Sequence, residues 1–365
     1  MIIMTLHIRM NNNKLKERNK IDKMKKATLA ICLLVLLQTL SGCHLFTAPS
    51  DKVSELARLQ IALDDSGYSM IGLMPDGTVH VITFPSTTGY TSDVSVWKDV
   101  KKITAGYMNV AAISKNGSVM FDNLDTTRIY HGHDEWPRPL LDVADWSEIV
   151  SVACGTYHIA GLKNDGTVVA KNADYWGSIN ALYSPAEVSL WTDIVAIEAG
   201  MNYTVGLRKD GTLVTCPALW TSTTTTRIEK WTDLVAISGS QYGLVGLRKD
   251  GTVLAACPIG SIPDRGQYQF SEWTDIIAVV ACETMTVGLR DDGTVVVSGA
   301  VEASSFVNEL ASWTNIVAID SSDNLVICYR KDGNIVYVRT KTDPNQDSIF
   351  TELDKWIENA LFNKS

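Results

Sequence analysis

The sequence predicts an all-β fold, a seven-bladed β-propeller built from repeats of about 42 residues. Three observations predict this fold. An Asp-Gly or Asn-Gly dipeptide recurs along the chain, a Trp followed two residues later by Asp, Glu or Asn recurs in register with it, and short apolar β-branched runs flank both. The helix pairs of a solenoid would instead show a period of 3.6 residues.

The turn dipeptide marks seven units. It recurs at spacings of 40, 49, 45, 40, 42 and 40 residues, at Asp76-Gly77, Asn116-Gly117, Asp165-Gly166, Asp210-Gly211, Asp250-Gly251, Asp292-Gly293 and Asp332-Gly333. Such a dipeptide between apolar runs indicates a tight hairpin, and we expect a type I′ turn with positive φ at both central residues.

The Trp marker places the first strand of each unit. It occurs at Trp97, Trp146, Trp191, Trp231, Trp273, Trp313 and Trp356. Each of the first six leads into an apolar run of strand length, such as residues 194–197. One unit is therefore a strand ending at a small residue, a short loop, a second strand, a tight turn and a third strand, followed by a variable stretch.

The two ends of the repeat array complement each other. The first unit has Ala57 where the Trp belongs, and Trp356 follows Trp313 by 43 residues without a further unit behind it. A C-terminal segment packed beside the first blade would close the ring and leave only short protected edges. The other interpretation of residues 348–365 is a capping helix, because apolar residues recur there at helical spacing.

The repeat resembles the bacterial form of the regulator of chromosome condensation repeat, over residues 57–356. The resemblance rests on the apolar strand, the small residue, Val-Gly-Leu, Lys/Arg-Asp-Gly and Thr-Val. It implies a propeller that works through protein contacts made by one face, by analogy with secreted members that inhibit β-lactamases. The sequence departs from the family after the small residue, where only His158 matches the His that the family often has.

Residues 1–42 have the features of a lipoprotein signal peptide. Residues 1–23 are polar and rich in Lys and Arg, and Met24 is an alternative translation start that would make them a misassigned leader. A basic Met-Lys-Lys then precedes a fourteen-residue apolar stretch, residues 27–40, which has the length of a signal-peptide core and is short for a membrane span.

Cys43 ends a sequence, Leu-Ser-Gly-Cys, that resembles a bacterial lipobox. The resemblance implies cleavage before Cys43, lipidation of its sulfur and an extracytoplasmic protein held at the bacterial membrane. An ordinary cleavage site with a chance Cys is the alternative. Residues 43–56 then form a polar tether, and residues 57–365 form the propeller.

Cleavage would leave a strongly acidic chain. The whole sequence has 32 basic and 41 acidic side chains, and residues 1–42 hold eight of the former and two of the latter, which leaves 24 and 39, a formal net charge of −15. That charge repels phosphate backbones and anionic headgroups. We therefore expect no nucleic-acid partner and membrane contact through lipid alone, and we expect a monomer without a cofactor.

The cysteines beyond Cys43 show no disulfide or zinc pattern. They are Cys154, Cys216, Cys257, Cys282 and Cys328. Their odd number and the absence of a C-x-x-C spacing argue against both kinds of site. We expect buried free thiols that act as small apolar side chains.

Two sets of polar residues are candidates for chemistry. The Asp residues of the turns and the acidic residues after each Trp recur in most units, whereas a catalytic pair should be singular, so we interpret them as turn chemistry. His131 and His133 form a weak metal-ligand candidate in His-Gly-His-Asp-Glu, and an exposed polar loop is the alternative.

The loops between the first and second strands differ from unit to unit and favour Tyr, Met and Asn. Their residues are Tyr107, Asn109, Tyr157, His158, Met201, Asn202, Tyr203, Gln241, Tyr242, Glu283, Met285, Asp323 and Asn324. In a ring these loops emerge on one face, where such residues suit a recognition surface. The alternative is that they fill the central channel.

The sequence therefore predicts a non-enzymatic scaffold at the cell surface or envelope, with one face of a propeller recognising another protein. A carbohydrate- or envelope-binding module is the first alternative. An enzyme with a site on the ring axis is the second.

Overall fold

Seven antiparallel sheets account for most of what the structure, a computed structural model, describes. Apart from one short N-terminal strand, each sheet consists of three strands consecutive in sequence. The described residues are 45–46, 60–63, 69–74, 76–83, 94–106, 109–123, 142–156, 158–172, 188–201, 203–216, 228–241, 243–256, 268–299, 304–322, 325–332, 334–339, 351 and 353–355.

We number the sheets as blades 1 to 7 in chain order. They are blade 1 (β2 Gln60–Leu63, β3 Ser69–Leu73, β4 Val79–Thr83), blade 2 (β5 Val100–Gly106, β6 Asn109–Ser114, β7 Val119–Asn123), blade 3 (β8 Ile149–Cys154, β9 His158–Lys163, β10 Val168–Asn172), blade 4 (β11 Ile194–Ala199, β12 Thr204–Arg208, β13 Leu213–Thr215), blade 5 (β14 Leu234–Gly239, β15 Leu244–Arg248, β16 Val253–Ala256), blade 6 (β17 Ile276–Ala281, β18 Thr286–Arg290, β19 Val295–Ser298) and blade 7 (β20 Ile316–Ser322, β21 Leu325–Arg330, β22 Ile335–Arg339).

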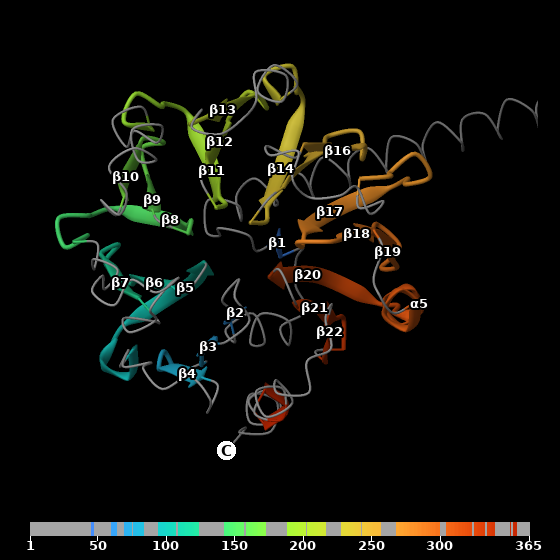
Figure 1. Cartoon of the computed structure of the whole chain (residues 1–365), viewed down its shortest axis with the longest axis horizontal. Coiled ribbons are helices and arrows are strands. Elements are labelled where there is room, and N and C mark those ends of the chain that lie inside the picture. Colours follow the sequence, from blue (N-terminus) through green and yellow to red (C-terminus); the bar gives the residue numbers. More distant parts are fainter. Residues whose placement is uncertain are drawn as a thin grey trace, which may run out of the picture.

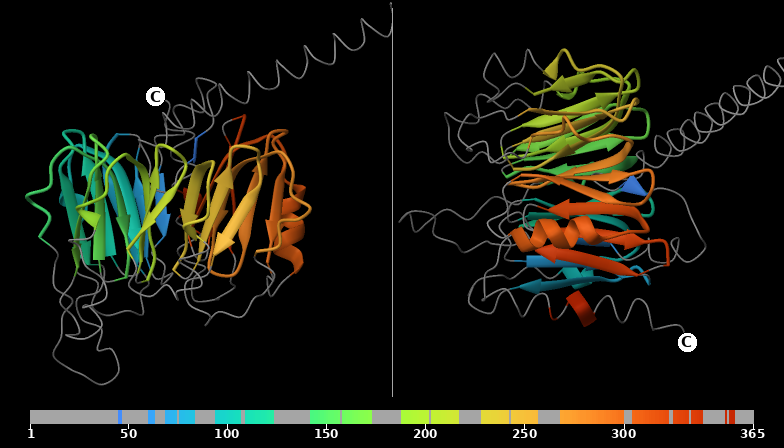
Figure 2. Two further views of the ribbon diagram at one scale, coloured as in Figure 1. Left: turned by 90° about the horizontal axis from the view of Figure 1, so that it is seen from above. Right: turned by 90° about the vertical axis from the view of Figure 1, so that its right-hand side faces the viewer.

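The blades are arranged around a common centre, with the first strand of each blade nearest to it (Figure 1). Seen from the side, the strands run roughly along the ring axis (Figure 2). The predicted all-β, seven-bladed propeller is confirmed. Because the strands alternate in direction, all first-to-second-strand loops lie at one end of the ring, which we call the loop end. The hairpins between second and third strands lie at the other, the hairpin end.

The apolar core lies between neighbouring blades. One cluster, for example, joins Val205 and Leu207 of blade 4 to Leu234, Ile237 and Leu244 of blade 5. Side chains on successive strand positions point to opposite faces of a sheet, and both faces of a blade meet another blade. The middle strands are therefore apolar at almost every position, as the buried run of β6 shows.

A short strand, β1 (Leu45–Phe46), lies within the segment predicted to be a polar tether. It pairs antiparallel with β20, Leu45 opposite Ile319 and Phe46 opposite Ala318, and it lies at the centre of the ring (Figure 1). Part of the predicted tether of residues 43–56 is thus joined to blade 7 by backbone hydrogen bonds, because the inner edge of β20 offers unpaired donors and acceptors.

The hairpins are not the type I′ turns that we expected. In blade 4 the amide of Gly211 donates to the Arg208 carbonyl (2.9 Å) and the amide of Arg208 donates to the Thr212 carbonyl (2.8 Å). Among the described turn residues only the glycines have positive φ, such as +83° at Gly211. The loop therefore has three residues, a tight turn followed by a left-handed Gly, and Asp210 needs no strained backbone.

The Asp, Glu or Asn two positions after each described Trp is held in the left-handed region, which Asp and Asn tolerate better than most residues. The residues are Asp99, Glu148, Asp193, Asp233, Asp275 and Asn315, with φ between 55° and 61°. The Asp193 carbonyl accepts a hydrogen bond from Lys209 in the hairpin of the same blade, at 2.8 Å. The next amide, of Ile194, donates to Gly166 of the preceding blade at 3.0 Å. This residue thus starts the first strand and joins two blades.

The Trp marker packs on the Gly of Val-Gly-Leu in the same blade. A Cβ placed on Gly288 would lie 2.7 Å from the ring of Trp273, and one on Gly206 would lie 3.0 Å from Trp191. The two sequence markers therefore form one contact, in which the missing side chain makes room for the indole ring.

An apolar residue three positions before each Trp repeats as well. These residues are Val94, Val143, Val188, Ile228, Phe270 and Leu310, and in each case the Trp amide donates to the carbonyl of that residue. Most of these residues are buried. The connecting segments include η1 (Val94–Val96) and α5 (Ser304–Ser312), which packs against β19 and β22.

The C-terminal segment follows the same pattern. Leu353, three residues before Trp356, is fully buried in a helical turn, and the Tyr337 hydroxyl of β22 donates to the Asp354 carboxylate at 2.9 Å. The segment is therefore helical at this point and also keeps the spacing of the repeat, so the two interpretations of residues 348–365 do not exclude each other. Trp356 itself lies outside the described residues.

Candidate functional site

Each described loop at the loop end is a turn with two residues at its tip. The amide of the small residue before the tip donates to the carbonyl of the residue after it, from Gly155 to His158 at 2.9 Å and from Gly200 to Tyr203 at 3.1 Å. Ser240 and Cys282 open the corresponding turns of blades 5 and 6. The turns are thus closed by backbone hydrogen bonds, which fix the direction of the tip residues.

The residue after each tip is buried and faces the next blade. We call these the junction residues; they are Asn109, His158, Tyr203, Gly243 and Met285. The Asn109 side-chain amide donates to the Gly155 carbonyl at 2.9 Å, and a ring nitrogen of His158 lies 3.0 Å from the Thr204 hydroxyl. Blade 2 is thereby bonded to blade 3, and blade 3 to blade 4.

Tyr203 makes the corresponding contact between blades 4 and 5. Its hydroxyl lies 2.7 Å from the carbonyl oxygens of both Ser240 and Gly243, to which it donates. Two serines continue the series: Ser238 accepts from the Ala281 amide at 3.0 Å, and Ser321 donates to the Ala281 carbonyl at 3.1 Å. Side chains thus connect every pair of neighbouring blades from blade 2 to blade 7.

Burial determines the protonation state of His158. Desolvation lowers its pKa from 6.5 to about 4, against a smaller opposing effect of a hydrogen bond with the Tyr203 backbone. His158 is therefore neutral at neutral pH, and its ring bonds to Thr204 without a charge.

In blades 3 and 4 the junction residue requires a Gly before the tip. A Cβ on Gly155 would lie 2.1 Å from the His158 ring, and one on Gly200 would lie 2.1 Å from the Tyr203 ring. The same Cβ atoms would lie 2.7 Å from backbone oxygens of the following blade. The first strands therefore approach one another closely at the loop end.

Three tip residues in consecutive blades remain partly exposed. They are Met201 of blade 4, Gln241 of blade 5 and Glu283 of blade 6. The Met201 amide donates to the Gln241 carbonyl at 3.0 Å, so the tips of blades 4 and 5 are directly joined. In blades 3 and 6 the tip residues Thr156 and Thr284 are buried.

The predicted recognition residues thus divide into two groups. Asn109, His158, Tyr203 and Met285 are buried at blade junctions, where they join sheets and are not accessible to a partner. Met201, Gln241 and Glu283 are partly exposed. The remaining predicted residues lie outside the described part, namely Tyr107, Tyr157, Asn202, Tyr242, Asp323 and Asn324, as do Cys43, His131 and His133.

The recurring acidic side chains have structural partners. In the hairpin of blade 4, Oδ1 of Asp210 accepts from the amide of Thr212 at 2.9 Å and from its hydroxyl at 2.6 Å. These hydrogen bonds lower the pKa of Asp210. Asp76, Asp165, Asp250 and Asp292 repeat the arrangement and the lowered pKa.

Tyr268 is a residue of this region that sequence reasoning missed. A Cβ on Gly243 would lie 2.4 Å from its hydroxyl oxygen, so Tyr268 occupies the space that a junction side chain fills in other blades. It belongs to the stretch before Trp273, which varies between units and gives no repeat signal. The Gly at the junction position was the one available hint.

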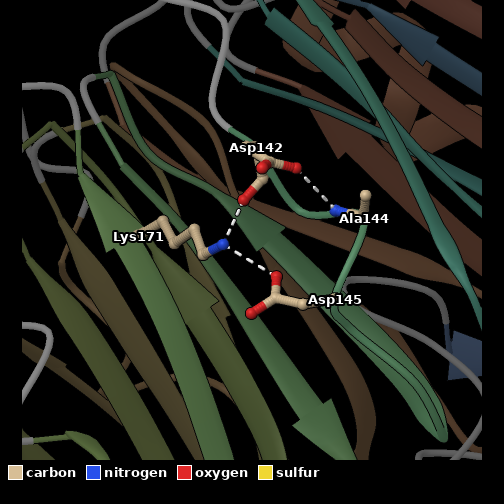
Figure 3. A network of polar contacts seen from close by, with 4 residues as sticks. All are labelled: Asp142, Ala144, Asp145 and Lys171. Atoms are coloured by element: carbon tan, nitrogen blue, oxygen red, sulfur yellow. Dashed lines mark hydrogen bonds and ion pairs between the residues drawn. The ribbon is translucent and has the colours of Figure 1, made fainter.

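A polar network fixes the segment that enters blade 3 (Figure 3). Lys171 of β10 donates to the Asp142 backbone carbonyl and, at 2.7 Å, to the Asp145 carboxylate, whose pKa is lowered mainly by this hydrogen bond. The Asp142 carboxylate accepts from the Ala144 amide at 3.0 Å. The network anchors the segment before Trp146 to the outer strand of the blade.

The described residues offer no other candidate centre. Cys154, Cys216, Cys282 and Cys328 are buried thiols outside any disulfide, as predicted, and Cys257 lies outside the described part. Within the same residues, no group of three side chains could hold a metal ion. None of the helices in the described part combines the length and apolarity needed to cross a bilayer.

The fold and the contacts between neighbouring blades define a seven-bladed β-propeller with three-stranded blades. Neither a protein-family model nor a curated protein matches the sequence. Among solved structures the chain is similar to Prp20p from Saccharomyces cerevisiae, at 15% identity and a TM-score of 0.50, over 82% of this chain and 86% of that one. At this identity the similarity shows the fold alone.

Two further structures have TM-scores below 0.5. Yeast RCC1 (Prp20) in its complex with Kap60 is 15% identical with a TM-score of 0.49, over 82% of this chain and 84% of that one. The CRINKLY WD40 ectodomain of the Arabidopsis thaliana receptor kinase ACR4 is 15% identical with a TM-score of 0.48, over 77% and 98%.

Proposed function

We propose that this protein is a non-catalytic scaffold of the bacterial envelope that binds another protein through the loop end of its ring. Cys43, as a lipidated N-terminus, would hold the ring at the extracytoplasmic face of the membrane. The lipobox-like sequence before Cys43 and the apolar stretch of residues 27–40 support this anchor.

One observation favours the loop end over the hairpin end as the binding surface. The hairpin end repeats the same contacts in blade after blade, whereas the tips at the loop end differ in sequence, and backbone hydrogen bonds close the turns of blades 3 to 6. Met201, Gln241 and Glu283 occupy the equivalent tip position with a thioether, an amide and a carboxylate. Partly exposed side chains of differing chemistry on a rigid support suit specific recognition, since little conformational entropy is lost on binding.

The repeat pattern also supports a non-catalytic role. The acidic residues that recur in the hairpins accept hydrogen bonds from Thr side chains and amides, as at Asp210.

Prp20p, whose structure is described together with its binding to Gsp1p and histones, is a protein of this fold that binds other proteins. A net charge of −15 after cleavage favours a protein partner over nucleic acid.

The test is a capture experiment with the tagged full-length chain in a bacterial host. The membrane fraction is crosslinked, and bound proteins are identified for the wild type, for a tip variant and for a control. The tip variant combines Met201→Ala, Gln241→Ala and Glu283→Ala. The control combines Lys209→Ala, Lys249→Ala and Asp291→Ala, which are exposed hairpin residues of the same three blades.

We expect the control to retain the wild-type partner and the tip variant to lose it. A Cys43→Ser chain should move out of the membrane fraction, since it lacks the acceptor sulfur. Loss of the partner in both triple variants, or in neither, would rule out the loop end as the binding surface. Retention of Cys43→Ser in the membrane would rule out the lipid anchor.

A further inference from the structure

Strand β1 has a defined direction relative to the ring. The first strand of blade 7, β20, begins at the hairpin end, because the Ile316 amide donates to the carbonyl of Gly293 in the hairpin of blade 6 at 3.0 Å. β20 therefore runs from the hairpin end to the loop end, and β1 pairs antiparallel with it. The amino side of Leu45 thus faces the loop end of the ring.

The position of β1 along the ring axis follows from its register. Leu45 lies opposite Ile319, the middle residue of β20, and β20 continues for three residues beyond this pair, to Ser322. At the rise of an antiparallel strand, the loop end of β20 is about 10 Å from Leu45. β1 is also close to the ring axis, since it lies at the centre of the view along that axis (Figure 1).

This geometry limits where the lipid anchor of the proposed function can attach. Cys43 is two residues before Leu45, and two residues of chain span at most about 7 Å. The path towards the hairpin end is taken by the chain that continues through Phe46. A lipid on Cys43 therefore reaches a bilayer by the shortest route past the loop end.

The described turns at the loop end are short enough for a bilayer to lie close to them. In blades 3 to 6 each turn has two residues at its tip and is closed by one backbone hydrogen bond. None of these four turns carries an insertion that would hold the first strands away from a membrane surface. This part of the loop end can therefore lie near the headgroups.

We propose that β1 holds the anchored ring with its loop end towards the bilayer, so that the partner recognised there is a protein held in the same membrane. This inference rests on the proposed function, because it uses both the lipid on Cys43 and the binding surface at the loop end. It adds the orientation of the ring and the location of the partner.

Fluorescence quenching at the membrane surface tests the orientation. The mature lipidated chain is placed in phosphatidylcholine vesicles that contain a lipid with a nitroxide quencher on its headgroup. A maleimide dye is attached at Met201→Cys, in the tip of blade 4, or at Lys209→Cys, in the hairpin of the same blade. The wild-type chain, treated with the same dye, gives the background from native thiols.

We expect the dye in the tip to be quenched about threefold or more strongly than the dye in the hairpin, because a strand of six residues separates the two ends by about 20 Å. Equal quenching of the two dyes, or stronger quenching in the hairpin, would overturn the inference. This comparison uses the unaltered β1 strand.

Two double variants of β1 test whether this strand sets the orientation. Leu45→Pro with Phe46→Pro removes both backbone amide donors of β1, whereas Leu45→Ala with Phe46→Ala keeps them. Thermal unfolding checks that both proteins are folded. We expect the Pro pair to abolish the difference between the two dyes and the Ala pair to retain it. A difference that persists in the Pro pair would show that β1 does not orient the ring.

The Cys43→Ser chain tests the location of the partner. Once this chain has left the membrane, the partner identified by capture should remain in the membrane fraction, because it is held there independently. Recovery of that partner from the soluble fraction would contradict a membrane-held protein.

Failure here is distinguishable from failure of the proposed function. An anchored chain that captures a partner through its tips, but whose two dyes are quenched equally, would leave the proposed function in place and remove the orientation. A Cys43→Ser chain that stays in the membrane would remove both, because the lipid would then not be the anchor.

Discussion

At the scale of single residues, His158 joins blades 3 and 4 in its neutral form. Its folded pKa of about 4 lies below the 6.5 of a free histidine, because burial disfavours the charged ring. The unfolded chain therefore binds a proton at a higher pH than the folded chain. The stability that follows from this difference is complete above pH 6.5 and is lost as the pH falls towards 4.

We predict that the free energy of unfolding falls by up to about 3 kcal/mol between pH 6.5 and 4 on account of this residue. His158→Gln should flatten that part of the profile, since Gln keeps a polar group near Thr204 but does not titrate. Urea unfolding at a series of pH values measures the slope. The Asp residues of the hairpins, whose pKa values are lowered, contribute below this window in both proteins. An unchanged slope in the variant would contradict the role of His158.

At the scale of the element, blades 3 to 6 share a close contact between the Trp and the Gly of the middle strand. The indole ring of Trp273 occupies the space over Gly288. Blade 2 has Ala112 and blade 7 has Cys328 at this position, and Trp313 of blade 7 is as buried as Trp231. The close contact with Gly is therefore a property of blades 3 to 6.

We predict that Gly288→Ala destabilises the protein by about 1–3 kcal/mol, because the added methyl overlaps the ring in a packed core. Chemical denaturation with Trp fluorescence measures the change. Cys328→Ala at the equivalent position of blade 7 adds no atom and serves as the matched control. A Gly288→Ala protein as stable as the wild type would show that the Trp can shift at no cost.

The strands and their order could be predicted from the sequence more readily than the roles of single side chains. Seven units, their strands and the Trp and Gly markers follow from repetition alone, since each copy reports the same local chemistry. The hairpin type did not follow, because Asp-Gly is compatible with both a two-residue and a three-residue loop and the difference lies in the hydrogen bond from Gly211 to Arg208. Burial of Tyr203 did not follow either, because only the neighbouring blade makes that position internal.

At the scale of the whole molecule, the C-terminal segment is docked on the last blade of the ring. Leu353 is fully buried in a helical turn, and Asp354 accepts from Tyr337 of blade 7. The segment has the apolar residue and the spacing to Trp356 that precede blades 2 to 7, and blade 1 has no Trp of its own. The C-terminal turn is thus equivalent to the segments that connect the other blades.

We predict that Leu353→Asp destabilises the protein by more than about 3 kcal/mol, because a buried apolar side chain is lost and a charge takes its place without a partner. Hydrogen exchange should show loss of protection first in blades 1 and 7. Asp354→Asn keeps a hydrogen-bond acceptor for Tyr337 and serves as the control. Exchange that increases equally in all blades would argue against a ring whose weakest joint is there.

The unequal regularity of the two ends has a consequence for how such a protein diversifies. One end sets the geometry through the same short hairpins and left-handed residues in each blade, so most substitutions there would be removed by selection for folding. The partly exposed tip residues Met201, Gln241 and Glu283 repeat no such contact from blade to blade. New specificities can therefore arise by changing about one position per sheet, without altering the architecture that displays it.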